Sequence, residues 1–323
     1  MRNLQLLAAA ILSGMIGFPL ASAQSYPAKP VRIINPYPAG GGADSLLRPI
    51  AQRMTESLKA TFVVDNRPGA NGMIGAEIAA KSPPDGYTLL MGSSSSLPMN
   101  AAIYPKMTYD PVKDFAPIST FMYSALILSV HPSVPVASVK DFIALAKARP
   151  GQITCASFGI ASSAHFAIAL FGLTTGTSIN HVPYKGSAPS IMSLLAGEVM
   201  SSFDTMQNAM PYIKAKRLRA LGIAALKRSP SEPSIPTIAE TGVPGFEIGT
   251  FFGVLAPANT PREIVTKLHA EIVKAVSLPD IRELYTKTGA EPLTNTPEEF
   301  AAMIQGEVIK WAKVAREANI HAE

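Results

Sequence analysis

Three consecutive glycines, Gly40 to Gly42, separate a short apolar segment, Val31 to Asn35, from an amphipathic segment that begins near Asp44. Glycines at the start of a helix let another molecule approach the backbone N–H groups, and the helix dipole adds roughly half a positive charge there. An anion is the usual partner of such a site. The stretch NPYPAGGGADSLLRP therefore predicts an anion-binding loop, in which Asp44 orders the chain and Gly41 permits close approach to the backbone.

Two nucleotide-binding motifs come close to this stretch without matching it. Gly40, Gly42 and Ser45 have the spacing of the dinucleotide fingerprint G-x-G-x-x-G, and Asp65 follows about 20 residues on, where a ribose-binding acid belongs. However, Ser45 replaces the third glycine, which normally permits close packing of the helix on the strand. A phosphate-binding P-loop would need a lysine directly after the glycines, and none is there.

The sequence also offers no clear nucleophile with its base. Ser162, Ser163 and His165 lie close together, but no G-x-S-x-G motif surrounds the serines. The single cysteine, Cys155, lies in an apolar segment and is expected to be a buried, inert thiol. The histidines lack metal-ligand spacing, so we expect no metal and no cofactor. An exported α/β enzyme, dinucleotide-dependent or a hydrolase, remains the alternative to a binding protein.

The glycine loop belongs to a regular alternation of strands and helices. The pattern predicts strands over 31–35, 61–65 and 87–91, with helices over 44–58 and 71–80 between them. Near-continuous apolar strands in this order are typical of a parallel sheet covered by helices on both faces.

A second set of elements repeats the arrangement. After residue 245, a strand over 251–256 leads to two helices, over 261–275 and 297–317, which we expect to pack back on the first unit. The chain should therefore cross between the units near residues 125 and 245. The second set comprises strands over 126–130, 153–156, 180–183, 199–204 and 218–224, and helices that begin near residues 138, 165 and 188.

Loops rich in glycine and serine follow strands in both units. Ser93, Ser94 and Ser95 follow the third strand of the first unit, and the loop 157–165 follows a strand of the second. Loops that leave parallel strands at their carboxyl ends share one edge of the sheet. If the two units face each other, these loops form opposite sides of one cleft and offer N–H and hydroxyl donors to an anion.

The N-terminus predicts export. Arg2 precedes a mostly apolar run over 6–20, and Ala21 to Ala23 form a small-residue cleavage site of the A-x-A kind, so residues 1–23 are expected to be a signal peptide cleaved after Ala23. The formal net charge of +5 comes from scattered basic residues, which gives no indication of nucleic-acid binding.

Several stretches together resemble one family, the Bug or TctC-like receptors of tripartite tricarboxylate transporters. The resemblance covers nearly the whole mature chain in order, and its combination of motifs is specific. The matching stretches include PVRIINPYPAGGGADSLLRPIAQRM, VVDNRPGANGMIGAEIAAKSPPDGYTLLMG, HVPYKGSAPSIMSLLAGEV, FDTMQNAMPYIKAKRLRALGI and SIPTIAETGVPGFEIGTFFGVLAPANTP.

The resemblance implies an α/β type II periplasmic-binding-protein fold, with two lobes that each hold a mostly parallel sheet and are linked by crossing strands. It implies lobe 1 over 24–124 and 246–323 and lobe 2 over 125–245. The expected protein is a periplasmic monomer that delivers a carboxylated solute to the membrane components of the transporter. The expected ligand-binding residues are Tyr37, Ala39, Gly40, Gly41, Asp44, Ser93, Ser94, Ser95, Phe158, Gly159, Ala161, Ser162, Ser163, His165, Tyr184, Asp204 and Phe252.

The second loop departs from the usual pattern of the family. Phe158 and Ile160 flank Gly159, and Ala161 replaces a second glycine. If Phe158 and Ile160 face the cleft, they add apolar surface beside the carboxylate site; if they turn inward, they pack the second lobe. The ligand expected from the first reading is a dicarboxylate, with an aromatic one such as terephthalate slightly ahead of a C4 to C6 aliphatic acid. An amino acid is less favoured, although Asp204 could hold its ammonium group.

Overall fold

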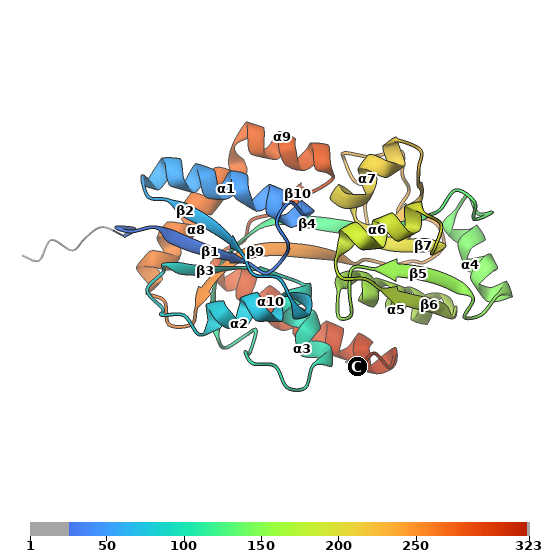
Figure 1. Cartoon of the computed structure of the whole chain (residues 1–323), viewed down its shortest axis with the longest axis horizontal. Helices are drawn as coiled ribbons and strands as arrows, with labels where there is room; N and C mark the ends of the chain where they lie inside the picture. The colour runs from blue at the N-terminus through green and yellow to red at the C-terminus, as the bar shows by residue number, and fades with distance from the viewer. Residues whose placement is uncertain (1–25, 322–323) are drawn as a thin grey trace, which may run out of the picture.

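The computed structural model describes residues 26–321, so the predicted signal peptide and its cleavage site lie outside the described residues. Figure 1 shows two α/β lobes side by side, the first with α1 and β1 to β3 and the second with α4 to α7. A pair of long strands, β4 (Phe115–Val130) and β9 (Gly249–Pro257), runs through the middle of the molecule and links the two lobes.

The sheet of the first lobe has the strand order β2-β1-β3-β9-β4. β1 (Val31–Asn35) pairs in parallel with β2 (Phe62–Asn66) and β3 (Thr88–Ser93), whereas β9 (Gly249–Pro257) is antiparallel to both β3 and β4. Every residue of β9 is buried, as expected for a strand with both faces covered. The helices of this lobe are α1 (Gly42–Leu58), α2 (Met73–Ala80), α3 (Asn100–Ile103), α8 (Arg262–Ser277) and α9 (Pro279–Thr288).

The sheet of the second lobe is built around β5 (Ile153–Ser157), which pairs in parallel with β6 (Ile179–Pro183) and β7 (Ser201–Thr205). The last part of β4 pairs antiparallel with β7 and with β8 (Arg219–Ile223). The helices of this lobe are α4 (Val139–Ala148), α5 (Ser163–Thr175), α6 (Ser187–Leu195) and α7 (Met206–Lys214).

The strand β4 (Phe115–Val130) belongs to both sheets. Its residues up to Ala125 pair with β9, and its residues from Leu126 pair with β7. The returning chain crosses beside it, because Leu126 N donates to Ile248 O and Ile248 N donates to Ala224 O. Both connections between the lobes are thus extended segments joined by backbone hydrogen bonds.

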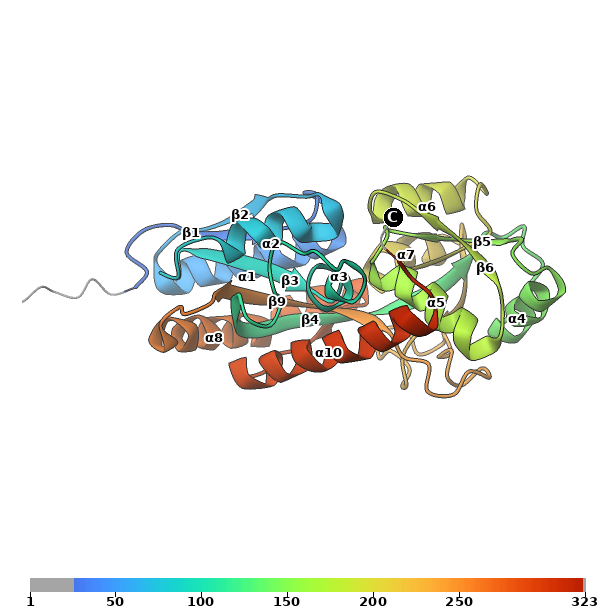
Figure 2. The same cartoon turned by 90° about the horizontal axis from the view of Figure 1, so that it is seen from below.

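The last helix, α10 (Pro297–Glu317), extends beyond the first lobe. It packs along β4 and α3, and Figure 2 shows it running beneath the first lobe towards α5 of the second. Trp311 packs edge-on against Phe166 of α5, with ring centroids 5.3 Å apart. The expectation that both C-terminal helices pack on the first unit is therefore wrong for α10, because its apolar end is buried in the core of the second lobe.

Most predicted elements are present within two residues, but some were not predicted. These are the first part of β4, α3, α7, α9, the short strand β10 (Glu291–Pro292), the 3-10 turn Ala70–Gly72 and the π-helical turn Ser95–Met99. Over residues 26–321, no helix is both long enough and apolar enough to cross a bilayer.

Candidate ligand-binding site

Three helices begin at the edge where the lobes face each other: α1 in the first lobe, and α6 and α7 in the second (Figure 1). Within the described part of the chain, no side chain caps the first turn of any of the three. By contrast, Ser138, Ser162 and Thr296 cap α4, α5 and α10. The first-turn N–H groups of an uncapped helix have no partner within the helix. The arrangement therefore offers donors and positive helix ends to an anion from both lobes.

The three glycines at the start of α1 have different surroundings. Gly40 has a positive φ of 77°, which glycine adopts without strain. A Cβ added to Gly41 would come no closer than 3.4 Å to another atom, the carbonyl oxygen of Pro38. A Cβ added to Gly42 would lie only 2.8 Å from Asn208 Oδ1 of α7. Close approach therefore requires a glycine at residue 42 and not at residue 41. The atom that approaches Gly42 belongs to Asn208 of the second lobe. Ala39, like Gly40 and Gly41, is exposed.

Asp44 holds this loop in place. Its buried carboxylate accepts hydrogen bonds from Gly40 N at 2.9 Å, from the side-chain amides of Asn35 and Asn66 at 2.9 Å each, and from Arg48 Nε at 2.8 Å. Burial alone would raise the pKa of Asp44, but these hydrogen bonds outweigh it and lower the pKa to about 2. Asp44 is therefore an ionised anchor of the loop, and Arg48 is engaged by it.

The serines at the carboxyl end of β3 lie where the two lobes meet. Ser93 Oγ is hydrogen-bonded to the hydroxyl of Tyr37, Ser94 Oγ accepts from Phe251 N at 3.1 Å, and Ser95 Oγ accepts from Ser163 N at 3.2 Å. All three serines are buried. These bonds join β3 to β9 and to α5. Ser94 and Ser95 accept in them and keep their hydroxyl hydrogens, so the expectation that they offer donors stays a prediction.

The loop 157–165 uses most of its N–H groups itself, contrary to the expectation that it offers them to the ligand. Ser162 and Ser163 are fully buried, and Ser163 Oγ also bonds Thr250 Oγ1 at 2.6 Å. Ala161 has a positive φ of 60°, the position where the family pattern has glycine. The N–H groups with protein partners are those of Gly159, Ala161, Ser162, Ser163 and His165.

The apolar side chains of this loop pack partly against the protein. Phe158 and Ile160 pack against the core of the second lobe, and Phe252 is buried in the core of the first, edge-on to Tyr37 at 6.3 Å. Tyr184 is half-buried, and its N–H donates to Ser157 O. Phe158 and Ile160 are only half-buried, so each packs part of its surface inward and leaves part exposed.

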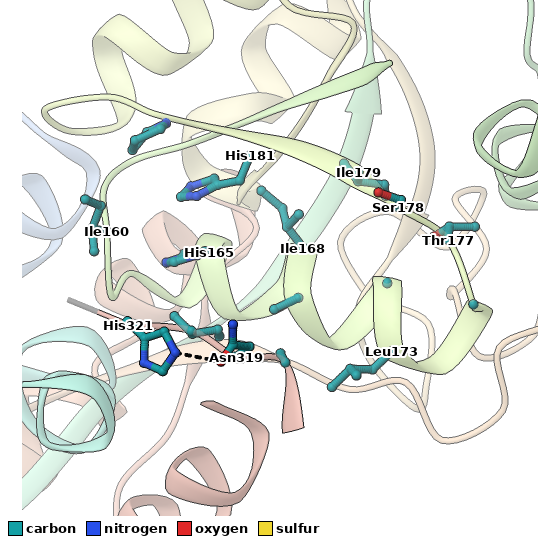
Figure 3. Close-up of a pocket in the computed structure, with 16 residues that line it drawn as sticks. Ile160, His165, Ile168, Leu173, Thr177, Ser178, Ile179, His181, Asn319 and His321 are labelled. Atoms are coloured by element: carbon teal, nitrogen blue, oxygen red, sulfur yellow. Dashed lines mark hydrogen bonds between the residues drawn. The ribbon is translucent and has the colours of Figure 1, made fainter. Parts of the chain in front are cut away.

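His165, in the first turn of α5, lies in the wall of a cavity that none of the starts of α1, α6 and α7 lines. This cavity, of about 850 Å³, lies between α5, β6 and the segment after α10 (Figure 3). His165 stacks on His181 at 3.9 Å, its Nδ1 accepts from Ala161 N, and His181 Nε2 is 2.6 Å from Ser157 Oγ. Burial lowers the pKa of His165 to about 4 and that of His181 to about 3, so both rings are neutral and hold the loop.

Asp204, at the end of β7, is fully buried beneath the starts of α6 and α7. Its carboxylate accepts hydrogen bonds from Ser187 Oγ of α6 and Asn208 Nδ2 of α7. It therefore does not stand open to an ammonium group. The residues of α7 that face Gly42, Gln207 and Asn208, were not predicted, because α7 itself was not; the polar pair directly after the strand is the signal that would have indicated them.

Two lobes joined by extended strands, with uncapped helix starts facing each other, define a solute-binding protein of the two-lobed periplasmic class. The family model described as "Tripartite tricarboxylate transporter family receptor" matches residues 46–320, and the chain belongs to this family. It is a transport receptor and not an enzyme, which overturns the enzyme alternative.

Individual relatives agree with this assignment. The chain is 38% identical to protein BugT of Bordetella pertussis over 299 residues, 92% of each chain. It is similar to the solved structure of R. palustris Rpa4515 with adipate, with 37% identity, a TM-score of 0.87 and coverage of 92% of this chain and 99% of that one. It is also similar to MatC from Rhodopseudomonas palustris with bound malate, with 29% identity, a TM-score of 0.82 and coverage of 90% and 99%.

Proposed function

We propose that this receptor captures an aliphatic dicarboxylate of four to six carbons in the periplasm and delivers it to the membrane components of its transporter. The observation that carries the proposal is the set of uncapped helix starts in both lobes, at the edge where the lobes face each other. One carboxylate would accept from the first turn of α1, and the other from the first turns of α6 and α7. A ligand with two separated carboxylates satisfies both lobes at once.

Two further points favour an aliphatic ligand over an aromatic one. Phe158 and Ile160, the side chains that favoured terephthalate, each have part of their apolar surface packed against the core of the second lobe, which leaves less of it for a flat ligand. Similar proteins have been solved with adipate and with malate, both aliphatic dicarboxylates. Terephthalate therefore becomes a competitor to be tested rather than the leading candidate.

We further propose that the lobes close on the ligand by bending at the crossings near Ala125 and Ile248, where the sheets divide. A ligand that binds both lobes gains its full set of contacts only in the closed form, so it shifts the population towards that form. We also propose export with cleavage after Ala23, which the mass of the periplasmic form would test. We propose that the protein functions as a monomer, which its elution volume in size-exclusion chromatography would test.

The test is isothermal titration of the purified mature protein with succinate, glutarate, adipate, citrate, terephthalate and benzoate. Micromolar or tighter binding of one aliphatic dicarboxylate, with weak binding of benzoate, is expected. The matched monocarboxylate of the best ligand serves as the control for the second carboxylate. Tight binding of terephthalate alone would restore the aromatic proposal, and equal binding of a monocarboxylate and its dicarboxylate would contradict the two-carboxylate arrangement.

A further inference from the structure

The strand β6 forms the outer edge of the sheet in the second lobe. Among the described residues it pairs with β5 alone, and the order of strands ends with it. Tyr184 N, directly after β6, donates to Ser157 O of β5. Because successive residues of a strand point their N–H and C=O groups to alternate sides, Ile179 and His181 point theirs away from β5. Over residues 26–321, no other segment bonds these outward groups.

The side chains of the same residues lie along the cavity described above. Alternate side chains of a strand share one face, and Ile179, His181 and Pro183 all line this cavity of about 850 Å³ (Figure 3). A further strand beside β6 would continue this face, so every second side chain of that strand would point towards the cavity. The free backbone edge and the cavity therefore form one continuous surface.

The opposite wall of the cavity is an apolar stripe of α5. The helix sequence SAHFAIALFGLTT contains no Asp, Glu, Lys or Arg. Ile168, Ala169, Gly172 and Leu173 lie along the cavity at helical spacing, and Leu173 is 44% exposed. A helix without a polar face normally packs against other elements all round. The small residues of this stripe leave room for the side chains of an added strand.

The charges around β6 indicate what kind of strand would add to it. Residues 142–197 contain no aspartate or glutamate but three basic residues. Lys185 follows β6 by two residues, and Arg149 lies near its start, because Gly151 N donates to Ser178 O. An acidic segment is attracted by these charges, whereas a second copy of the chain would bring the same positive charges to the contact.

We propose that the free edge of β6 and the cavity beside it, here called the β6 edge site, dock an extended acidic segment of the transporter's membrane component. This docking site rests on the proposed function, because it names where the receptor delivers its solute. The segment adds as a strand that pairs with Ile179 and His181, places an apolar side chain beside Leu173, and brings carboxylates near Arg149 and Lys185. A layer of lipid headgroups lacks the alternating donors and acceptors that this edge pairs with.

The test is the binding of the dicarboxylate-loaded receptor to the membrane component of its transporter in nanodiscs, measured by biolayer interferometry. Leu173→Glu should weaken this binding by about tenfold or more, because it places a carboxylate on the apolar stripe. Met192→Glu is the matched control. Met192 is 57% exposed on α6, which packs on the opposite face of the same sheet, so this variant should dock like the wild type.

The contribution of charge is tested separately. Arg149→Glu should weaken docking, and the binding of the wild type should fall as the salt concentration rises, because ions screen the attraction between exposed charges. Docking that is unchanged both by Arg149→Glu and by salt would overturn the choice of an acidic segment.

Amide hydrogen exchange tests the pairing of the strand. In the free receptor, the N–H groups of Ile179 and His181 should exchange quickly, and those of Asn180 and Val182, which point to β5, should exchange slowly. The bound membrane component should slow the exchange of the first pair by about tenfold or more and leave the second pair unchanged. Unchanged exchange of Ile179 and His181 at saturation would overturn the β6 edge site.

Titration with the dicarboxylate separates this docking site from the proposed function. Leu173→Glu and Met192→Glu should bind the dicarboxylate as the wild type does, which also establishes that both variants fold. Equal docking of the two variants would overturn the β6 edge site and leave a dicarboxylate receptor. Failure of every dicarboxylate to bind would overturn the proposed function and, with it, the role of the docking site.

Two further outcomes would assign the β6 edge site to another occupant. Equal binding to nanodiscs of anionic lipid without the membrane component would overturn the peptide in favour of a lipid surface. A dimer in size-exclusion chromatography that Leu173→Glu dissociates would overturn it in favour of a second copy of the chain.

Discussion

Gly42 and Asn208 meet across the two lobes. The space that a Cβ atom of residue 42 would fill lies 2.8 Å from the side-chain oxygen of Asn208, so the start of α1 and the start of α7 are as close as a glycine allows. The contact lies where the uncapped helices face each other, and it therefore couples the separation of the lobes to the size of one side chain.

Gly42→Ala should weaken ligand binding by about tenfold or more, since a methyl group forced into a packed contact costs roughly 1–3 kcal/mol. The lobes can relieve the clash by opening, so small-angle scattering should give a larger radius for the ligand-bound variant than for the ligand-bound wild type. Gly41→Ala is the matched control, because its Cβ would have only an ordinary contact. Equal effects of the two substitutions would contradict the contact between α1 and α7.

Asp44→Asn should lower the free energy of unfolding by about 2 kcal/mol at pH 7, because the pKa of Asp44 is lowered from 3.8 to about 2 by its hydrogen bonds. This contribution is present above pH 3.8 and is lost as pH falls through 2. Urea unfolding of the variant and the wild type should therefore differ at pH 7 and converge towards pH 2. A difference that does not depend on pH would show that the charge of Asp44 is not what stabilises the loop.

His181→Phe should make the protein less sensitive to mild acid. The pKa values of His165 and His181 are lowered by burial, so the unfolded chain binds protons below pH 6.5 while the folded chain does not. Stability is therefore complete above pH 6.5 and falls as pH drops towards 4. Phenylalanine keeps the stacking on His165 but cannot be protonated.

The measurement is the thermal midpoint at pH 8 and at pH 5. At pH 8 the variant should be less stable by about 1 kcal/mol, because the hydrogen bond to Ser157 is lost. Between pH 8 and pH 5 its midpoint should fall less than that of the wild type. An equal fall in both proteins would mean that other groups cause the acid sensitivity.

Ligand binding should change the fluorescence of Trp311. It is the only tryptophan of the chain, and its ring lies on α10 against Phe166 of the second lobe, so bending between the lobes alters its surroundings. Emission should follow the same saturation curve as the heat of binding. Phe166→Leu, which keeps the site apolar but removes the ring contact, should reduce the change. An unchanged emission at saturation would mean that α10 and α5 move together.

The sequence predicts the alternation of strands and helices well, because buried parallel strands and amphipathic helices have distinct periods. It predicts β4 poorly: FAPISTFMYSALILSV changes from one sheet to the other at Ala125, and a strand that continues through a lobe boundary has no local signal. α7 was not predicted because MQNAMPYIK contains a proline, Pro211, inside the helix and has only a short apolar face.

The candidate site was likewise predicted only where it has a local signal in the sequence. The start of α1 could be predicted because consecutive glycines directly before an amphipathic segment are typical of an anion-binding loop. Which loop of the second lobe has free N–H groups is not visible, because it depends on side-chain partners such as His165 and Ser95, which only the folded chain brings to the loop.

The position of β9 has a consequence for how the chain folds after export. β9 lies between β3 and β4 in the sheet, yet about 120 residues separate the end of β4 from the start of β9, and most of the second lobe lies in that interval. A polypeptide that emerges amino end first presents β1, β2, β3 and β4 long before the strand that must join them. Until residue 257 has emerged, the edges of β3 and β4 have no partner and can pair with other chains. The second lobe can form its sheet earlier, so the half of the cleft that carries Asp204 is assembled before the half that carries the glycine loop is complete.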